Sequence, residues 1–293
     1  MKPRDIRDLV LLAAIWGGSF LFMRLGAHDF GPIPMTALRV GLASLVLLPV
    51  LAWRGGLAEV RKAWRPLLLL GLINNALPFA FFVFAALSIT AGMSSILNAT
   101  TPLWGALVAA LWLGEALSLW RSMGLLIGFG GVIFLAWDHA EFKPGGTGWA
   151  VAACLAAAFC YAVAASYTKR RIKGVGPLAI ATGSLISATL WLIVPAIWLW
   201  PAEPPRLAAW ASLAALALVC TAVAYIIYFR LMLRVGPTNA IAVTFLNPVF
   251  AVLWGWLFLA EPLTGRLGVG CAIVLLGTAL SVGAINPSAR RRP

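Results

Sequence analysis

The sequence predicts an all-α polytopic membrane protein with ten transmembrane helices, arranged as two inverted five-helix repeats. Three observations lead to this prediction: an apolar composition, ten apolar segments of membrane-spanning length, and an internal repeat. Hydrophobic residues make up 62% of the 293 residues and charged residues only 11%. Soluble domains carry about 25% charged residues. The composition therefore excludes a disordered chain, a coiled coil, a disulfide scaffold and an ordinary soluble enzyme.

Ten apolar segments are long enough to cross a bilayer, for which about 20 apolar residues suffice. Short connections rich in Gly, Pro and charged residues separate them and leave no room for a soluble insert. The first segment begins like a signal peptide, but its apolar run continues through Leu25 without a cleavage site, so we expect an uncleaved span. The predicted spans are residues 9–26, 33–53, 66–87, 92–113, 119–137, 147–168, 177–199, 207–229, 238–260 and 266–285.

The basic residues predict how these spans are oriented. With a cytoplasmic N-terminus, 17 of the 22 Lys and Arg residues fall in inside segments, and only Arg24, Lys143, Arg206 and Arg266 fall outside. Lys and Arg gather in cytoplasmic loops of membrane proteins, so we expect both termini to be cytoplasmic. The same rule accounts for the net charge of +13, and no nucleic-acid partner is expected.

The second half of the chain repeats the first at a nearly constant offset. Equivalent residues lie 145 or 146 positions apart, and they include Trp16 with Tyr161, Phe79 with Tyr225, Phe82 with Tyr228, Asn98 with Thr244, Thr101 with Asn247, Pro102 with Pro248, and Glu115 with Glu261. We therefore divide the chain into repeats at 1–145 and 146–293. Five is an odd number of spans, so the second repeat must enter the membrane from the opposite side. Many secondary transporters have this architecture, although duplication can also simply produce a stable bundle.

Polar residues near span centres are costly, so those that occur there are candidates for function. Prolines within such spans bend the helix and free a carbonyl group, which predicts hinges or gates at Pro78, Pro102 and Pro248. Polar and aromatic residues at the same depth predict the substrate site. The candidates are Trp16, Asn74, Phe79, Asn98, Thr101, Tyr161, Tyr225, Tyr228, Thr244, Asn247 and Trp254.

Charge is nearly absent from the predicted spans. No Asp, Glu or His lies near a span centre. Proton-driven transporters usually keep such a group in the membrane, so the simplest mechanism is an uncoupled facilitator, or uniporter. Arg39 lies within a span, and we expect a structural role for it, with its side chain snorkelling outward. Neutral amides and aromatic rings suit a small neutral or zwitterionic solute with an apolar part.

Other residue types favour packing over chemistry. The four cysteines lie inside apolar runs without metal-ligand spacing, so we expect no metal and no cofactor. Glycines in the fifth and tenth spans, among them Gly124, Gly128 and Gly277, form smooth faces. These faces could bind each other or a second protomer, and the sequence leaves the oligomeric state open, a monomer included.

The ten spans, the duplication, the opening Trp16-Gly17-Gly18-Ser19 and the two Pro…Glu signatures resemble the EamA family of the drug/metabolite transporter superfamily. The resemblance covers essentially the whole chain, and within the family it is greatest to the YddG group of bacterial exporters of aromatic amino acids. It implies multi-pass insertion in the bacterial inner (plasma) membrane and alternating access. It also implies a basket-like bundle whose cavity is lined by spans one, three, four, six, eight and nine, with spans five and ten as outer supports.

The EamA signature specifies no substrate, so other functions remain open at this point. One alternative is a transporter of a different neutral metabolite or lipophilic drug, with or without a coupled proton. A membrane-embedded enzyme or receptor is a further alternative. An intramembrane enzyme should carry paired carboxylates or a His cluster, and the sequence has neither, so we expect no enzyme.

Overall fold

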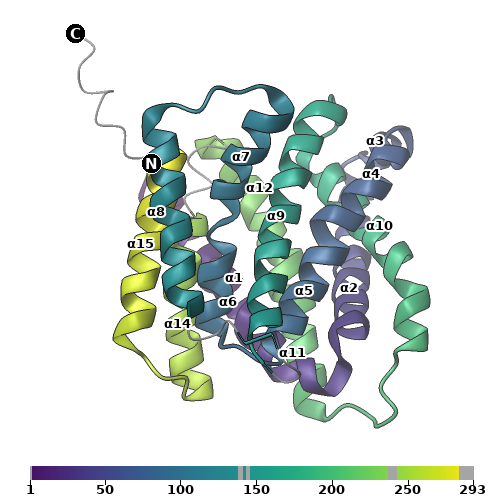
Figure 1. Cartoon of the computed structure of the whole chain (residues 1–293). Helices are drawn as coiled ribbons and strands as arrows, with labels where there is room; N and C mark the ends of the chain where they lie inside the picture. The colour runs from purple at the N-terminus through teal and green to yellow at the C-terminus, as the bar shows by residue number, and fades with distance from the viewer. Residues whose placement is uncertain (1, 138–140, 143–145, 237–242, 284–293) are drawn as a thin grey trace.

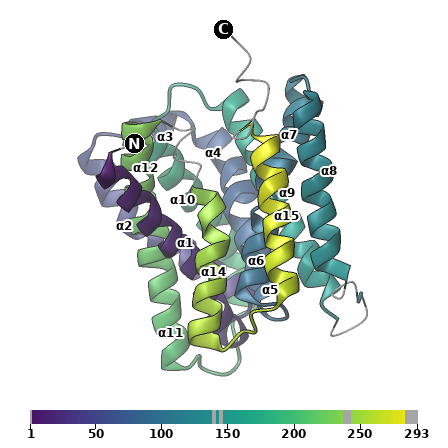
Figure 2. The ribbon, with the colours of Figure 1, turned by 90° about the vertical axis from the view of Figure 1, so that its left-hand side faces the viewer.

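The computed structural model describes residues 2–137, 141–142, 146–236 and 243–283, and these residues form a bundle of helices (Figures 1 and 2). In the first half the helices are α1 (Pro3–Phe30), α2 (Pro32–Trp53), α3 (Leu57–Lys62), α4 (Trp64–Gly71), the π-helix η1 (Leu72–Ala76), α5 (Leu77–Ala86), α6 (Ala91–Asn98), α7 (Thr101–Leu113) and α8 (Leu119–Ala136). In the second half they are α9 (Gly148–Arg171), α10 (Pro177–Trp198), α11 (Leu207–Ala214), the π-helix η3 (Ala215–Val223), α12 (Ala224–Val235), α14 (Val243–Leu259) and α15 (Gly265–Ser281).

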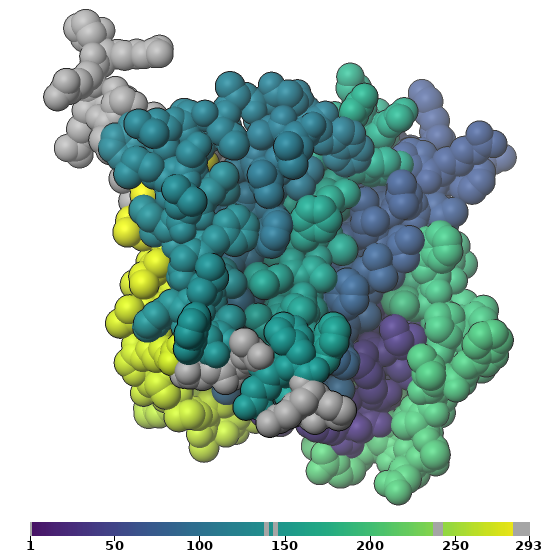
Figure 3. All heavy atoms as spheres, viewed as in Figure 1, coloured from purple at the N-terminus to yellow at the C-terminus, as the bar shows by residue number. Residues whose placement is uncertain are grey.

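The helices agree with the predicted spans. Among the described residues, eight helical segments are long and apolar enough to cross a membrane, and the shorter apolar helices α14 and α15 account for the ninth and tenth predicted spans. The predicted all-α polytopic fold is therefore confirmed. Large apolar side chains on the outer surface, such as Leu111 at 80% and Leu126 at 76% exposed, suit contact with lipid. Figure 3 shows part of this surface, formed in front by α7, α8 and α9.

The first span is longer than the sequence predicted, because α1 begins at Pro3 and ends at Phe30 rather than covering only residues 9–26. Its charged first turns are tied to the end of α12. The Arg234 Nε lies 3.1 Å from the Asp5 carboxylate, and Arg234 also pairs with Asp8. The predicted span covers only the apolar residues, whereas the helix continues through the charged residues at its ends. This explains why α1 is longer than the predicted span.

The repeat is visible in the details of the helix ends. α8 and α15 both begin with a hydroxyl cap. The Ser118 hydroxyl accepts a hydrogen bond from the Arg121 backbone N–H at 3.3 Å, and the Thr264 hydroxyl accepts one from the Leu267 backbone N–H at 3.2 Å. α7 and α14 are both followed by a left-handed residue, Gly114 (φ 71°) and Ala260 (φ 52°). The same local geometry at positions 146 residues apart supports the duplication independently of side-chain similarity.

Two π-helical segments occupy equivalent places in the third and eighth spans. η1 contains Asn75, and η3 contains Thr221, which is 146 residues further along. A π-helical turn widens the helix and often marks a functional position. Neither segment was predicted. Pro78 gives a local reason for the first, since it cannot donate to the helix preceding it, but η3 contains no proline.

Helices α8 and α15 pack closely against each other. A Cβ added to Gly124 would lie 2.5 Å from the Ser281 backbone nitrogen and 2.7 Å from the Gly277 oxygen, so the backbones meet where glycine has no side chain. A Cβ on Gly130, by contrast, would meet nothing within 4 Å. Of the two partners that the sequence left open for these glycine faces, the structure shows the intramolecular one.

The two ends of the bundle carry different residues. We call the end with Pro3, Glu115 and Lys169 the terminal face, since α1 starts there (Figure 1). The other end, with Phe30 and Glu261, is the opposite face. Because α1 starts at the terminal face and α9 starts at the opposite face, the two halves run through the bundle in opposite directions (Figures 1 and 2).

Candidate substrate site

A cavity of about 640 Å³ lies between the two halves of the bundle. This volume falls within the range of about 300–1,000 Å³ that is typical of small-molecule sites. Its lining extends to the terminal face, where Glu115 and Arg121 have side chains 38% and 39% exposed. The cavity therefore reaches the surface at the terminal face.

Ten of the eleven residues expected at a substrate site line this cavity. They are Trp16, Asn74, Phe79, Asn98, Thr101, Tyr161, Tyr225, Tyr228, Thr244 and Asn247. Nine of these ten fall into the equivalent pairs of the repeat, and Phe82, the partner of Tyr228, lines the cavity as well. The walls are thus built from the same positions of both halves.

The eleventh expected residue, Trp254, lies outside the lining. Its indole N–H donates a hydrogen bond to the carbonyl oxygen of Ala14 at 2.9 Å, which fixes α14 against α1. Beside this contact, Gly17 brings the two backbones together, because an added Cβ would lie 2.9 Å from the Ala251 nitrogen. Trp254 thus supports the wall that carries Trp16, whose ring packs 5.2 Å from that of Tyr228.

The prolines expected to act as hinges occupy three different settings. The fourth span is interrupted before Pro102, since α6 ends at Asn98 and α7 starts at Thr101. The Thr101 hydroxyl donates to the Asn98 carbonyl oxygen at 2.7 Å and satisfies part of the interrupted backbone. Pro78 follows η1 at the start of α5, and only Pro102 of the three lines the cavity.

Pro248 does not interrupt its helix in the same way. Among the described residues, α14 runs through Pro248 from Val243 to Leu259. The residues that precede α14, 237–242, lie outside the described part of the chain, and so does the start of the predicted ninth span. Next to Pro248, the Oδ1 atom of Asn247 is buried without a hydrogen-bond partner among the described residues. A carboxamide oxygen in the cavity wall is thus available to a ligand donor.

Arg39 does not snorkel outward, and that expectation is wrong. The residue is only 5% exposed and lines the cavity. Its Nε donates to the hydroxyl of Thr221 in η3 at 3.0 Å, and its guanidinium lies 3.8 Å from the centre of the Phe79 ring. The second span therefore contributes to the cavity, which the family resemblance did not imply.

The equivalent of Arg39 in the second repeat is Ser184, and it makes the equivalent contact. The Asn75 amide in η1 lies 2.9 Å from the Ser184 hydroxyl and donates to it. Thus each repeat sets a residue of its second helix against the π-helix of the other repeat. Asn75 and Ser184 are both buried, and neither lines the cavity. The two halves share this geometry but differ in charge.

Sequence reasoning missed further lining residues, among them Ser19 and Cys220. Ser19 lies three residues after Trp16, so helical periodicity would place both on one face. For Cys220 the sequence carries no signal, because a cysteine inside an apolar run is typical of a packed core. The four cysteines are free, and no group of three His, Cys, Asp or Glu among the described residues could hold a metal.

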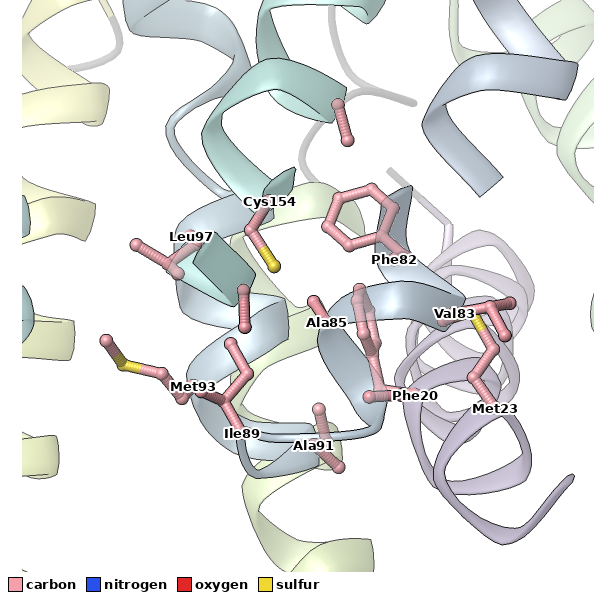
Figure 4. Close-up of a cluster of buried hydrophobic side chains, with 14 of the residues drawn as sticks. Phe20, Met23, Phe82, Val83, Ala85, Ile89, Ala91, Met93, Leu97 and Cys154 are labelled. Carbon is pink, nitrogen blue, oxygen red and sulfur yellow. The ribbon is translucent and has the colours of Figure 1, made fainter. Parts of the chain in front are cut away.

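An apolar cluster forms the floor of the cavity. Phe20, Met23 and Phe82 line it from below and belong to a buried core that also contains Ile89 and Leu97 (Figure 4). The rings of Phe20 and Phe82 meet edge to face with centroids 5.5 Å apart. Phe20 and Met23 belong to the part of α1 nearer Phe30, so the cluster lies on the side of the cavity toward the opposite face.

Below the cluster, at the opposite face, Glu261 joins three helices. Its carboxylate accepts hydrogen bonds from the Ala91 backbone N–H at 3.0 and 3.1 Å, at the start of α6. It also lies 3.5 Å from the Nε of Arg24 on α1, with a side chain only 11% exposed. Arg24 in turn donates to the Ala86 carbonyl oxygen at 2.6 Å.

An equivalent ion pair lies at the terminal face. Lys169 is the counterpart of Arg24 at offset 145, and its Nζ lies 2.8 Å from the carboxylate of Glu115, the counterpart of Glu261. Hydrogen bonding to Lys169 holds the pKa of the Glu115 carboxyl below its ordinary value, so this carboxylate is charged at neutral pH. This pair is exposed, since the side chains of Lys169 and Glu115 are 69% and 38% accessible. The Arg24–Glu261 pair, by contrast, is largely buried.

The fold and the cavity define a multi-pass membrane protein with a solute-sized site between two inverted halves. A family model, the EamA-like transporter family, matches residues 9–137 and again residues 148–283. The chain belongs to this family, and it is a membrane transporter rather than an enzyme.

Curated relatives are similar over nearly their whole length. The uncharacterized transporter YoaV of Bacillus subtilis is 21% identical over 274 residues, covering 92% of this chain and 93% of the relative. An uncharacterized transporter of Archaeoglobus fulgidus is 26% identical, with 93% and 95% covered. The uncharacterized inner membrane transporter YedA of Escherichia coli K12 is 28% identical, with 84% and 80% covered.

The fold is also similar to a solved crystal structure. The match has a TM-score of 0.67 at 21% sequence identity and covers 99% of this chain and all of the other. At this identity the match supports the fold, and the substrate must be argued from the cavity itself.

Proposed function

We propose that the protein exports aromatic and other apolar amino acids across the bacterial inner membrane, as an uncoupled facilitator that works by alternating access. The observation that carries the proposal is the cavity lining, in which aromatic rings from both repeats face neutral amides and hydroxyls. Aromatic rings offer apolar area with a defined stacking geometry. Carboxamides and hydroxyls can accept from an ammonium group without a permanent charge of their own.

The acidic groups of the lining support uncoupled transport. Among the described residues that line the cavity, the only carboxylate is Glu115, which lies at the mouth and is paired with Lys169. A proton-coupled carrier would need a titratable group at the substrate, within the membrane.

The two equivalent ion pairs support alternating access. In this conformation the Arg24–Glu261 pair is largely buried and the cavity reaches the terminal face. In the other conformation the roles exchange: the Lys169–Glu115 pair becomes buried and closes the terminal face, while Arg24 and Glu261 separate. The inverted repeat makes the two conformations nearly equivalent in packing, which keeps their free energies close.

We further propose that the terminal face is cytoplasmic, because the excess of Lys and Arg lies in the segments on that side. The repeats at 1–145 and 146–293 would then be the two halves that rock against each other. The relative YedA is named as an inner membrane transporter, which supports the same membrane for this chain. Resemblance to the YddG group supports the choice of aromatic amino acids.

Uptake of radiolabelled tryptophan into liposomes that contain only the purified protein tests this proposal. We expect saturable uptake without any ion gradient, and the same initial rate when a pH gradient of either sign is imposed. Uptake that requires a pH gradient would contradict the uncoupled mechanism. No uptake of tryptophan, phenylalanine or leucine, with uptake of a nucleobase or a lipophilic drug instead, would contradict the substrate.

A further inference from the structure

Arg39 is a buried cation without an acidic partner. It is 5% exposed, and the ion pairs of the described residues do not include it. The carboxylates in those pairs belong to Asp5, Asp8, Asp29, Glu115 and Glu261. A charge held within the membrane is costly unless it is paired, and such residues mark substrate pathways. The cost of Arg39 therefore calls for a partner that the described residues do not supply.

The surroundings of Arg39 hold its guanidinium in a fixed orientation. Thr221 accepts from Nε at 3.0 Å, Phe79 packs against the guanidinium at 3.8 Å, and the Met23 sulfur lies 3.7 Å from one terminal nitrogen. A guanidinium has five N–H donors, and these contacts use only part of them. The second terminal nitrogen makes no hydrogen bond to the described residues. Two terminal nitrogens of one guanidinium match the two oxygens of a carboxylate.

Among the described residues that line the cavity, Arg39 is the one buried cation, since the other, Arg121, is exposed at the mouth. At the equivalent position, Ser184 is neutral and is sealed by its hydrogen bond with Asn75. The aromatic residues Trp16, Tyr161 and Tyr225 line the cavity together with Arg39. A ligand that suits this arrangement has one carboxylate and an aromatic or apolar body.

We propose that Arg39 binds the carboxylate of the transported solute and thereby selects monocarboxylates over their neutral analogues. The inference deepens the proposed function and rests on it, since it assigns a role to Arg39 within the same cavity. In the terms of that proposal, Arg39 holds the carboxylate of the amino acid while the rings hold its side chain. Phe79 and Thr221 are positioning residues for the guanidinium.

Isothermal titration calorimetry of the purified protein tests the inference with two acids and their amides: tryptophan and tryptophanamide, indole-3-propionate and indole-3-propionamide. We expect each acid to bind at least about tenfold more tightly than its amide, because charge-assisted hydrogen bonds are roughly twice as strong as neutral ones. In Arg39→Gln the ratio should fall to about one. Ser184→Ala, at the equivalent position outside the cavity, should keep the native ratio.

Each result bears on the inference. Equal affinities for acid and amide in the native protein, no binding of either acid, or a native ratio retained in Arg39→Gln would overturn it. If Arg39→Gln does not fold, Thr221→Val keeps the charge and releases Nε, and a reduced ratio is expected there. Preference for indole-3-propionate without any uptake of tryptophan would support the role of Arg39 and contradict the amino-acid substrate. Uptake of tryptophan without preference for either acid would do the reverse.

Discussion

Replacing Glu261 with glutamine should open the opposite face. The substitution keeps a hydrogen-bond acceptor for the Ala91 N–H but removes the charge that faces Arg24 and the start of α6. A charge at a helix N-terminus contributes about 0.3–1 kcal/mol, and up to about 2 when it is partly buried. Hydrogen bonds to charged groups contribute about 1.5–3 kcal/mol against about 0.5–1.5 for neutral ones.

Together these contributions predict that Glu261→Gln destabilises the closed opposite face by about 2 kcal/mol, which shifts the conformational equilibrium about 30-fold. The matched control is Glu115→Gln. Because the Lys169–Glu115 pair is exposed in this conformation, its loss should leave the opposite face closed. The two variants remove the same charge from equivalent positions, so any difference between them reflects burial.

Electron–electron double resonance between spin labels on the opposite face measures the shift. Labels at Ser88 in the first half and Gly265 in the second, both exposed at the opposite face, suit the experiment in a background that lacks the four native cysteines. We expect a longer distance population in Glu261→Gln that is minor in the native protein and in Glu115→Gln. Identical distance distributions in the native protein and Glu261→Gln would refute the role of this ion pair.

Three further predictions concern packing and the cavity. Gly124→Ala should lower the melting temperature, because the added methyl group overpacks against α15 at a cost of about 1–3 kcal/mol. Gly130→Ala on the same helix should leave the melting temperature unchanged, and a thermal unfolding assay in detergent compares the two variants. Asn98→Ala and Asn247→Ala should each reduce tryptophan uptake at unchanged membrane insertion, and unchanged uptake in both would place the substrate elsewhere. Tyr225→Ala should change the preference among tryptophan, phenylalanine and leucine, and an equal loss for all three would indicate a packing role instead.

The repeat explains why much of the cavity lining could be predicted from the sequence. Span number follows from apolar length, and the offset of 146 residues then pairs positions such as Asn98 with Thr244 at one depth. Both members of this pair line the cavity. Amphipathic patterning was of little help, because a helix in lipid is apolar on its outer side as well.

The parts that could not be predicted depend on partners distant in the chain. The direction of the Arg39 side chain is set by Thr221, 182 residues away, and by the ring of Phe79. A local pattern that allows snorkelling equally allows an inward orientation. The same holds for Trp254, where the hydrogen bond to Ala14 rather than the depth in the membrane decides its position.

The π-helical segments are a second example. In η1, Pro78 provides a local reason for the altered turn. η3 contains no proline, and its described contacts include α1, α2 and the Arg39 side chain. Propensity does not separate a π-turn from an α-turn in an apolar span. The equivalent position of the two segments in the repeat could be recognised only after the structure was known.

The central claim is that the solute binds in the cavity between the repeats. A crystal structure with 5-bromotryptophan tests it directly, since anomalous scattering locates the bromine atom. We predict one bromine peak per chain, in contact with the rings of Trp16 or Tyr225 and with the carboxylate within reach of Arg39. Bromine found only on the outer surface of the bundle, in crystals of protein that takes up tryptophan, would contradict the account.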